Sequence, residues 1–193
     1  MSKSEVGVIP ETEFDSKFGL AYASVFVDES QLASLDRSVR TTPFVNKAWE
    51  TVLVPYGLYG IITNATEFKA LERAALEVGD EVAIITDIEP IPPHRYSVLT
   101  TWDEQSFEAA CDTGFLKHVD SVLFGRSMGW GAFCATDDYS WIGGHAGFMQ
   151  VFIAEAGGIT VLRDRFLSFA SDEWQVDSAF RDALLERVGW LAR

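Results

Sequence analysis

The chain has 193 residues, of which 48% are hydrophobic and 23% are charged, proportions typical of a globular protein that folds as one domain. Its 15 lysines and arginines stand against 29 aspartates and glutamates, so the formal net charge is −14 at pH 7. This balance excludes the broad basic face that nucleic acids and anionic membranes attract. We therefore expect no nucleic acid and no membrane among the partners.

The cysteine count and the hydropathy pattern predict the compartment. Cys111 and Cys134 are the two cysteines, and a pair of unlinked thiols is typical of a reducing cytosol. Residues 1–10 have no apolar core of signal-peptide length, and no apolar run approaches the roughly 20 residues of a membrane span. We expect a cytoplasmic protein. Zinc-ligand spacing, a P-loop and a dinucleotide fingerprint are all missing from the sequence, so we expect no metal and no cofactor.

The first part of the chain predicts an arm followed by a globular domain. Residues 1–19 are polar and acidic, and we expect a flexible acidic arm there, with a single globular domain over residues 20–193. Residues 21–27 (A-Y-A-S-V-F-V) have the aromatic and β-branched composition of a strand. Residues 28–35 predict a short helix, and residues 36–46 predict a loop.

A clearer alternation of strands and helices follows. Residues 58–63 predict a buried strand, residues 64–78 a helix and residues 81–88 a second strand. This order over some thirty residues suggests a βαβ or split-βαβ unit. A third strand over residues 95–102 and a helix over residues 103–117 come next.

The second half of the chain predicts a hairpin between helices. The expected elements are a strand at 121–124, a hairpin of strands at 130–136 and 139–142, a helix at 145–156, strands at 159–162 and 166–169, and a terminal helix at 176–191. Together these elements predict a single-domain α+β (or α/β) fold. We expect a mixed central sheet of about five or six strands with flanking helices.

One short motif suggests catalysis. Residues 125–129 (G-R-S-M-G) match the pattern G-x-S-x-G, and residues 121–124 supply a strand before it. This stretch resembles the nucleophile elbow of the α/β-hydrolase family, a resemblance that implies a nucleophilic Ser127. His145 is the one histidine after Ser127, and it lies in a glycine-rich loop where it would act as the base. The resemblance covers some ten residues. Beyond them the chain departs from that family, because a predicted hairpin, and not a helix, follows the serine. The alternative is a glycine-rich loop before that hairpin.

A second candidate site lies on the hairpin itself. Trp130, Tyr139 and Trp141 gather around the predicted turn at Asp137 and Asp138. An aromatic patch rimmed by carboxylates suits protein recognition. The alternative is that these rings pack into the core.

A third pattern is the pair of carboxylates at Asp87 and Glu89, two residues apart at the end of a predicted strand. Such a pair can bind a metal ion or share a proton. Because prolines follow at once, we interpret it instead as an exposed turn.

The acidity favours a function in binding. We expect an acidic module that binds a basic protein, most concretely an immunity-like or antitoxin-like inhibitor of a basic toxin or enzyme in bacteria. A small serine hydrolase that uses Ser127 and His145 is one alternative, and a structural or scaffold protein of phage or bacterial origin is another. A homodimer is a further arrangement that the sequence allows.

Overall fold

The structure is a computed structural model. It describes residues 7–32, 42–55, 65–88, 96–112, 116, 119–135, 139–173 and 178–190. The predicted strand at 58–63 and the hairpin residues Asp137 and Asp138 lie outside this part of the chain.

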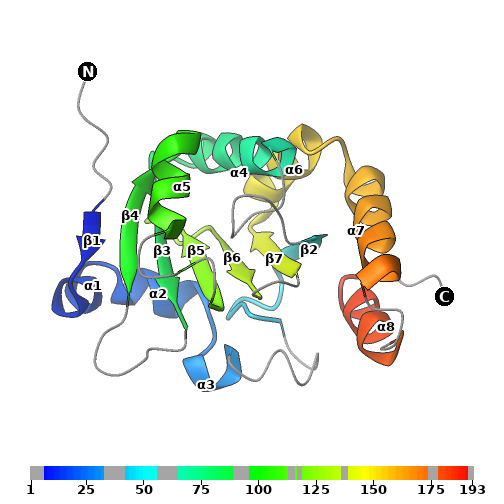
Figure 1. The fold of residues 1–193 in the computed structure, drawn as a ribbon, viewed down its shortest axis with the longest axis horizontal. Coiled ribbons are helices and arrows are strands. Elements are labelled where there is room, and N and C mark those ends of the chain that lie inside the picture. Colours follow the sequence, from blue (N-terminus) through cyan, green and yellow to red (C-terminus); the bar gives the residue numbers. More distant parts are fainter. Residues whose placement is uncertain are drawn as a thin grey trace.

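A seven-stranded sheet forms the centre of the described residues (Figure 1). Its order is β1-β4-β3-β5-β6-β7-β2, and every neighbouring pair is antiparallel. The strands are β1 (Gly7–Ile9), β2 (Glu50–Pro55), β3 (Val82–Asp87), β4 (Ser97–Thr101), β5 (Ser121–Phe124), β6 (Trp130–Cys134) and β7 (Tyr139–Gly144). The α+β class is confirmed, with seven strands in place of five or six.

Helices cover both faces of the sheet, so successive side chains of each central strand enter different cores. In β3, for example, Ile84 belongs to one apolar cluster and Ile85 to the other. The Ile85 face packs against α4 (Ala65–Glu77), α5 (Glu104–Asp112) and α6 (Ala146–Glu155). Antiparallel sheets often leave one face in water, whereas this one is buried on both, which explains the continuous apolar runs of its strands.

The opposite face packs against the beginning and the end of the described chain. The helices α1 (Glu11–Lys17), α2 (Gly19–Val25) and α3 (Glu29–Leu32) lie along it (Figure 1). At the β2 edge the long helix α7 (Ile159–Glu173) contributes Leu162 to one core and Phe166 to the other, and α8 (Ser178–Arg187) follows it. Thus α7 joins the two cores and covers one edge of the sheet.

A buried ion pair fixes α7 to the helical layer on the Ile85 face. Glu67, in the first turn of α4, is fully buried and accepts a hydrogen bond from Arg165 of α7. A carboxylate is seldom buried without a charged partner, and the Arg165 guanidinium supplies that partner here.

Several predicted elements are confirmed, with ends that differ by a few residues. These are α4, β3, β4, α5, β5, the β6–β7 pair, α6 and α8.

Two predicted strands are helices, and in each the reason is tertiary packing. Residues 21–27 were expected as a strand, but α2 spans most of them because Ala21, Tyr22 and Val25 fall on one buried helical face. The expected strands at 159–162 and 166–169 lie within α7, where Leu162, Phe166 and Ala170 recur every four residues as a buried stripe.

The segment expected as a flexible acidic arm contains packed structure over its described part, residues 7–19. β1 pairs with β4, and Phe14 of α1 is fully buried against Phe18, Tyr22 and Phe124. The acidic side chains of α1 point outward while its aromatic ring enters the core. The arm interpretation therefore does not hold for these residues.

Among the helices of the described residues, none is both long enough and apolar enough to span a membrane.

The packing of α1 predicts a large effect of truncating Phe14. Phe14→Ala removes a buried ring that touches three other aromatic side chains, so we expect a loss of about 3–5 kcal/mol in the free energy of unfolding, measured by urea denaturation. The matched control is Leu20→Ala on α2, because Leu20 is 74% exposed. That control should change stability by about 0.5 kcal/mol or less. Equal and small effects of both variants would mean that α1 does not pack on the sheet.

Candidate functional site

The G-R-S-M-G motif forms the turn of a β-hairpin. It connects β5 to β6, and Phe124, the last residue of β5, is directly opposite Gly131, the second residue of β6. At its tip Met128 has φ +58°, a left-handed conformation that non-glycine residues seldom adopt. A nucleophile elbow instead connects a strand to a helix, whose first N–H groups stabilise the oxyanion. The expected elbow is therefore corrected to a strand–strand turn.

A buried carboxylate holds this turn in place. Asp80, in the turn between α4 and β3, is 4% exposed. Its Oδ1 accepts the backbone N–H of Ser127 at 3.0 Å. Its Oδ2 accepts the Ser127 hydroxyl at 2.6 Å and the Trp130 indole N–H at 2.8 Å. The backbone carbonyl of Asp80 also accepts the indole N–H of Trp102 at 2.9 Å. Hydrogen bonds to an ionised carboxylate are the strong ones, so this group acts as a clamp between distant segments.

The glycines of the motif leave room for this clamp. A Cβ atom at position 125 would lie 1.9 Å from Oδ2 of Asp80. A Cβ atom at position 129 would lie 2.7 Å from Cδ2 of His145. Because the two glycines of G-x-S-x-G have no Cβ atom, the side chains of Asp80 and His145 can lie close to the hairpin backbone.

The structure brings Ser127 and His145 to the same glycine but does not link them as a catalytic relay. A Cβ at Gly129 would lie 2.8 Å from Nε2 of His145 and 3.5 Å from Oγ of Ser127. Nδ1 of His145 accepts the N–H of Phe148 at 3.2 Å and so caps α6. In the serine-hydrolase relay the hydroxyl donates to the histidine, whereas here it donates to Asp80.

The three aromatic side chains of the second candidate site are in the core. Trp130, Tyr139 and Trp141 are each at most 1% exposed. The Trp130 ring stacks on Phe148 of α6 with their centroids 5.1 Å apart. The expectation that these three rings form an exposed recognition patch is therefore corrected, whereas Asp137 and Asp138 lie outside the described residues.

The two cysteines are free and buried. Burial raises the pKa of the Cys134 thiol to about 12, so this thiol is protonated and unreactive at neutral pH. Within the described residues there is also no group of three or more His, Cys, Asp or Glu side chains that could hold a metal ion.

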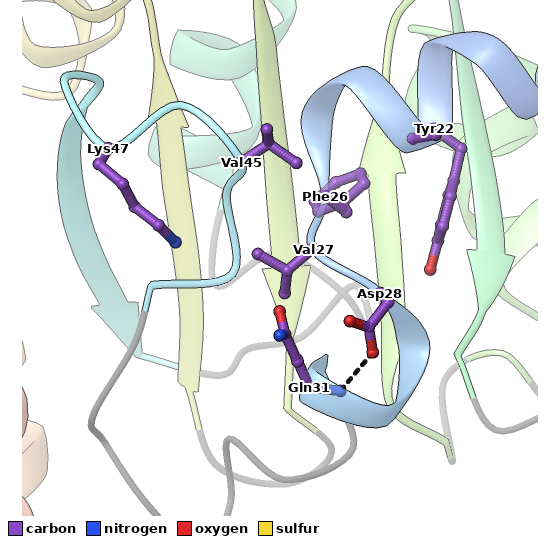
Figure 2. Close-up of a pocket in the computed structure, with 8 residues that line it drawn as sticks. Tyr22, Phe26, Val27, Asp28, Gln31, Val45 and Lys47 are labelled. Carbon is purple, nitrogen blue, oxygen red and sulfur yellow. Dashed lines mark hydrogen bonds between the residues drawn. The ribbon is translucent and has the colours of Figure 1, made fainter.

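A groove of about 560 Å³ lies on the other face, between α2, α3 and the segment that precedes β2. Figure 2 shows Tyr22 and Lys47 on opposite sides of it, with Phe26, Val27 and Val45 between them. The Nζ of Lys47 donates a hydrogen bond to the backbone carbonyl of Phe44 at 2.9 Å. The positively charged group that lines the groove is therefore already bonded within the chain. The groove is mainly apolar, and sequence analysis did not identify it.

The exposed face of α5 is the most one-sided charged surface among the described helices. Asp103 caps the helix by accepting the N–H of Ser106 at 2.9 Å. Hydrogen bonds from the Thr101 hydroxyl and from Ser106 hold the pKa of Asp103 below its usual range. Three exposed carboxylates then follow at intervals of four residues, and we call this set the α5 carboxylate stripe: Glu104, Glu108 and Asp112.

The opposite face of α5 anchors the stripe to the fold. Phe107 and Cys111 are buried there, and the Phe107 ring lies 4.9 Å from that of Phe68 on α4. No lysine or arginine occurs within α5. Lys69 of α4 forms an ion pair with Glu104 at the start of the stripe, with its Nζ 3.9 Å from Oε1. The stripe therefore presents its charge from a fixed position on the surface.

Comparison of the chain with protein-family models, with curated protein sequences and with solved structures found no match. The function must therefore be argued from the arrangement of these residues.

The clamp predicts a graded series of stability losses. Asp80→Ala removes the acceptor of the buried Trp130 indole N–H and both bonds to Ser127, so we expect a loss of about 3 kcal/mol or more. Ser127→Ala removes one of these bonds and should lose about 1–2 kcal/mol. The exposed neighbour provides the control Glu81→Ala, with a change of about 0.5 kcal/mol or less.

Chemical denaturation measures this series, and the NMR signal of the Trp130 indole N–H provides a local readout. That signal should move in Asp80→Ala and stay in Glu81→Ala. Equal stability of all three variants would show that Asp80 does not hold the hairpin.

Proposed function

We propose that this chain is a protein-binding module that engages a basic protein and inhibits or shields it, as bacterial immunity and antitoxin proteins do. The observation that carries the proposal is the α5 carboxylate stripe. The hairpin region does not carry it, since the hairpin aromatic side chains are buried.

The stripe has an energetic disadvantage for the isolated chain. Like charges four residues apart on a helix destabilise it by a few tenths of a kcal/mol per pair. Glu104 and Glu108 form one such pair, and Glu108 and Asp112 form the next. A cation from another molecule would turn this repulsion into attraction, so the arrangement favours a basic partner.

The charges of the other long helices are arranged differently. In α7, Arg163 pairs with Asp164, and in α8, Arg181 pairs with Asp182. These helices solubilise the protein with mixed charges, whereas α5 carries one sign only. A charge that served solubility alone would not need this concentration on one helix. The difference supports a role for α5 in recognition.

Electrostatic attraction to such a surface acts mainly on the rate of encounter. Complementary charge raises association rates by about 10–1,000-fold at low ionic strength, and salt weakens the effect because the screening length is about 8–10 Å. A salt-dependent on-rate is therefore the expected signature of binding through α5.

A hydrolase is the second candidate function, favoured by one observation. Ser127 is exposed, and its hydroxyl donates to the Asp80 carboxylate at 2.6 Å, a distance at which a carboxylate acts as a general base. Against it stands the saturation of that carboxylate, which also accepts two N–H groups. The binding module thus remains the better-supported function.

The location of the acidic surface predicts how charge reversal affects binding. Glu104→Lys/Glu108→Lys should lower the association rate with the basic partner about tenfold or more, because it removes the stripe. The control variant Glu155→Lys/Asp172→Lys makes the same change in net charge at exposed positions of α6 and α7. It should have a much smaller effect.

The partner is recovered by affinity purification with the wild-type chain, and rates are measured by surface plasmon resonance at low and high salt. An equal loss of association rate in both variants would mean that binding depends on the overall negative charge and not on α5 in particular. A partner without a basic surface would contradict the proposal altogether.

The two candidate functions differ in the reactivity of Ser127. We expect no adduct when the purified chain is treated with a fluorophosphonate probe and analysed by intact mass, because the hydroxyl is bonded within the clamp. A single adduct that disappears in Ser127→Ala would favour the hydrolase instead.

A further inference from the structure

A second polar feature lies at the opposite end of the sheet from the Asp80 clamp. Asp87 is the last residue of β3 and Ser121 is the first residue of β5, and the two are directly opposite in the register. Residues paired in this way direct their side chains to the same face of the sheet, with Cβ atoms about 5 Å apart. This face is the one that α4, α5 and α6 cover.

Both side chains are buried, and each has an oxygen without a hydrogen-bond partner. Asp87 is 5% exposed and Ser121 is 1% exposed. Oδ1 of Asp87 and Oγ of Ser121 accept and donate no hydrogen bond. Oδ2 of Asp87 accepts one bond, at 3.3 Å, from the backbone N–H of Tyr96. Buried polar atoms are paired in nine cases of ten or more, so unpaired oxygens on two opposed residues require an explanation.

The burial of Asp87 also corrects the expectation of an exposed turn at this residue. Glu89, the other half of that expected pair, lies outside the described residues.

Among the described residues, Asp87 forms no ion pair with a lysine or arginine. Burial raises the pKa of the Asp87 carboxyl, and the negative charge of Glu11 raises it further. The row of opposed residues continues through Cys134 and Ser140, of which the thiol is protonated at neutral pH. The row therefore offers one carboxylate among neutral polar groups.

The pair lies close to the surface. Tyr96, which donates to Asp87, is 42% exposed, and Asp120, which precedes Ser121, is half-buried.

We propose that Asp87 and Ser121 form a binding site for a single cationic nitrogen group, an alkylammonium or alkylguanidinium. The group donates one hydrogen bond to Oδ1 of Asp87 and a second to Oγ of Ser121, and its charge balances the carboxylate. The source is a lysine or arginine side chain of the basic partner or a free small amine. The first source rests on the proposed function, and the second does not.

The test titrates the full chain with ethylguanidinium chloride or ethylammonium chloride, far below denaturing concentrations. Tetramethylammonium chloride is the matched control, since it carries the same charge but has no N–H to donate. The NMR signals of the Tyr96 and Ser121 amides report binding. We expect saturable shifts with the two N–H donors and none with tetramethylammonium.

Variants then locate the site. Asp87→Asn should weaken the binding of ethylguanidinium by about tenfold or more, and Ser121→Ala should weaken it by a smaller factor. The surface control Glu155→Gln, at an exposed position of α6 outside the α5 carboxylate stripe, should leave it unchanged. Shifts that do not saturate, that tetramethylammonium reproduces, or that persist unchanged in Asp87→Asn would overturn the proposal. Ser121→Ala removes a hydroxyl only, so it remains informative if Asp87→Asn does not fold.

The same variants distinguish the two sources. Weaker binding of the basic partner to Asp87→Asn assigns the cation to that partner, and unchanged binding assigns it to a free amine. Both assignments require that ethylguanidinium binds Asp87→Asn more weakly than it binds the wild type. If the α5 charge reversal leaves partner binding intact while ethylguanidinium still binds, the proposed function fails alone. If Asp87→Asn binds ethylguanidinium as the wild type does, the cation site fails alone.

Discussion

The carboxylate of Asp80 joins two segments that the chain separates by 47 residues. It accepts two bonds from Ser127 and one from Trp130, and so fixes the β5–β6 hairpin against the turn between α4 and β3. The same turn accepts the Trp102 indole N–H just before α5. Because an unpaired buried carboxylate destabilises the fold, these bonds favour α4, the hairpin and the start of α5 packing together.

This constraint connects the interior to the surface. Trp130 stacks on Phe148 of α6, and Trp102 stacks on Phe107 of α5 with centroids 6.1 Å apart. The two indoles that bond to Asp80 thereby position the helices over the sheet. The α5 carboxylate stripe projects from the far side of that layer, so its charges occupy fixed places. A surface held in this way loses little entropy on binding.

The sequence predicted the long, strongly periodic elements correctly and failed where local composition and packing disagree. Helix α4 has a clear apolar stripe in the sequence, and Phe68, Leu71 and Ala75 of that stripe are buried in the structure. In α2 the valine and aromatic residues favour a strand locally, yet the contacts of Tyr22 and Phe26 with Phe124 require a helix. β1 was missed because three residues are too few to show a period.

The residues of the candidate site were likewise predicted only where local sequence was sufficient. G-x-S-x-G correctly marked a tight turn, but its chemistry depends on Asp80, which no local pattern associates with Ser127. The unpaired oxygen of Asp87 was beyond sequence analysis, since its burial depends on neighbours from other strands. For α5 the signal was present, as acids at intervals of four without a base, although only the fold shows that this face is exposed.

The central claim is that acidity is concentrated on α5 for recognition, and amide chemical-shift mapping with an oligo-lysine peptide tests it most directly. The account predicts that the largest saturable shifts fall on the amides of α5 and on the neighbouring outer residues of α4. They should disappear in Glu104→Lys/Glu108→Lys and persist in Glu155→Lys/Asp172→Lys. Shifts of similar size on α1, α5, α6 and α7 would show a diffuse charge without a dedicated surface, and would contradict the account.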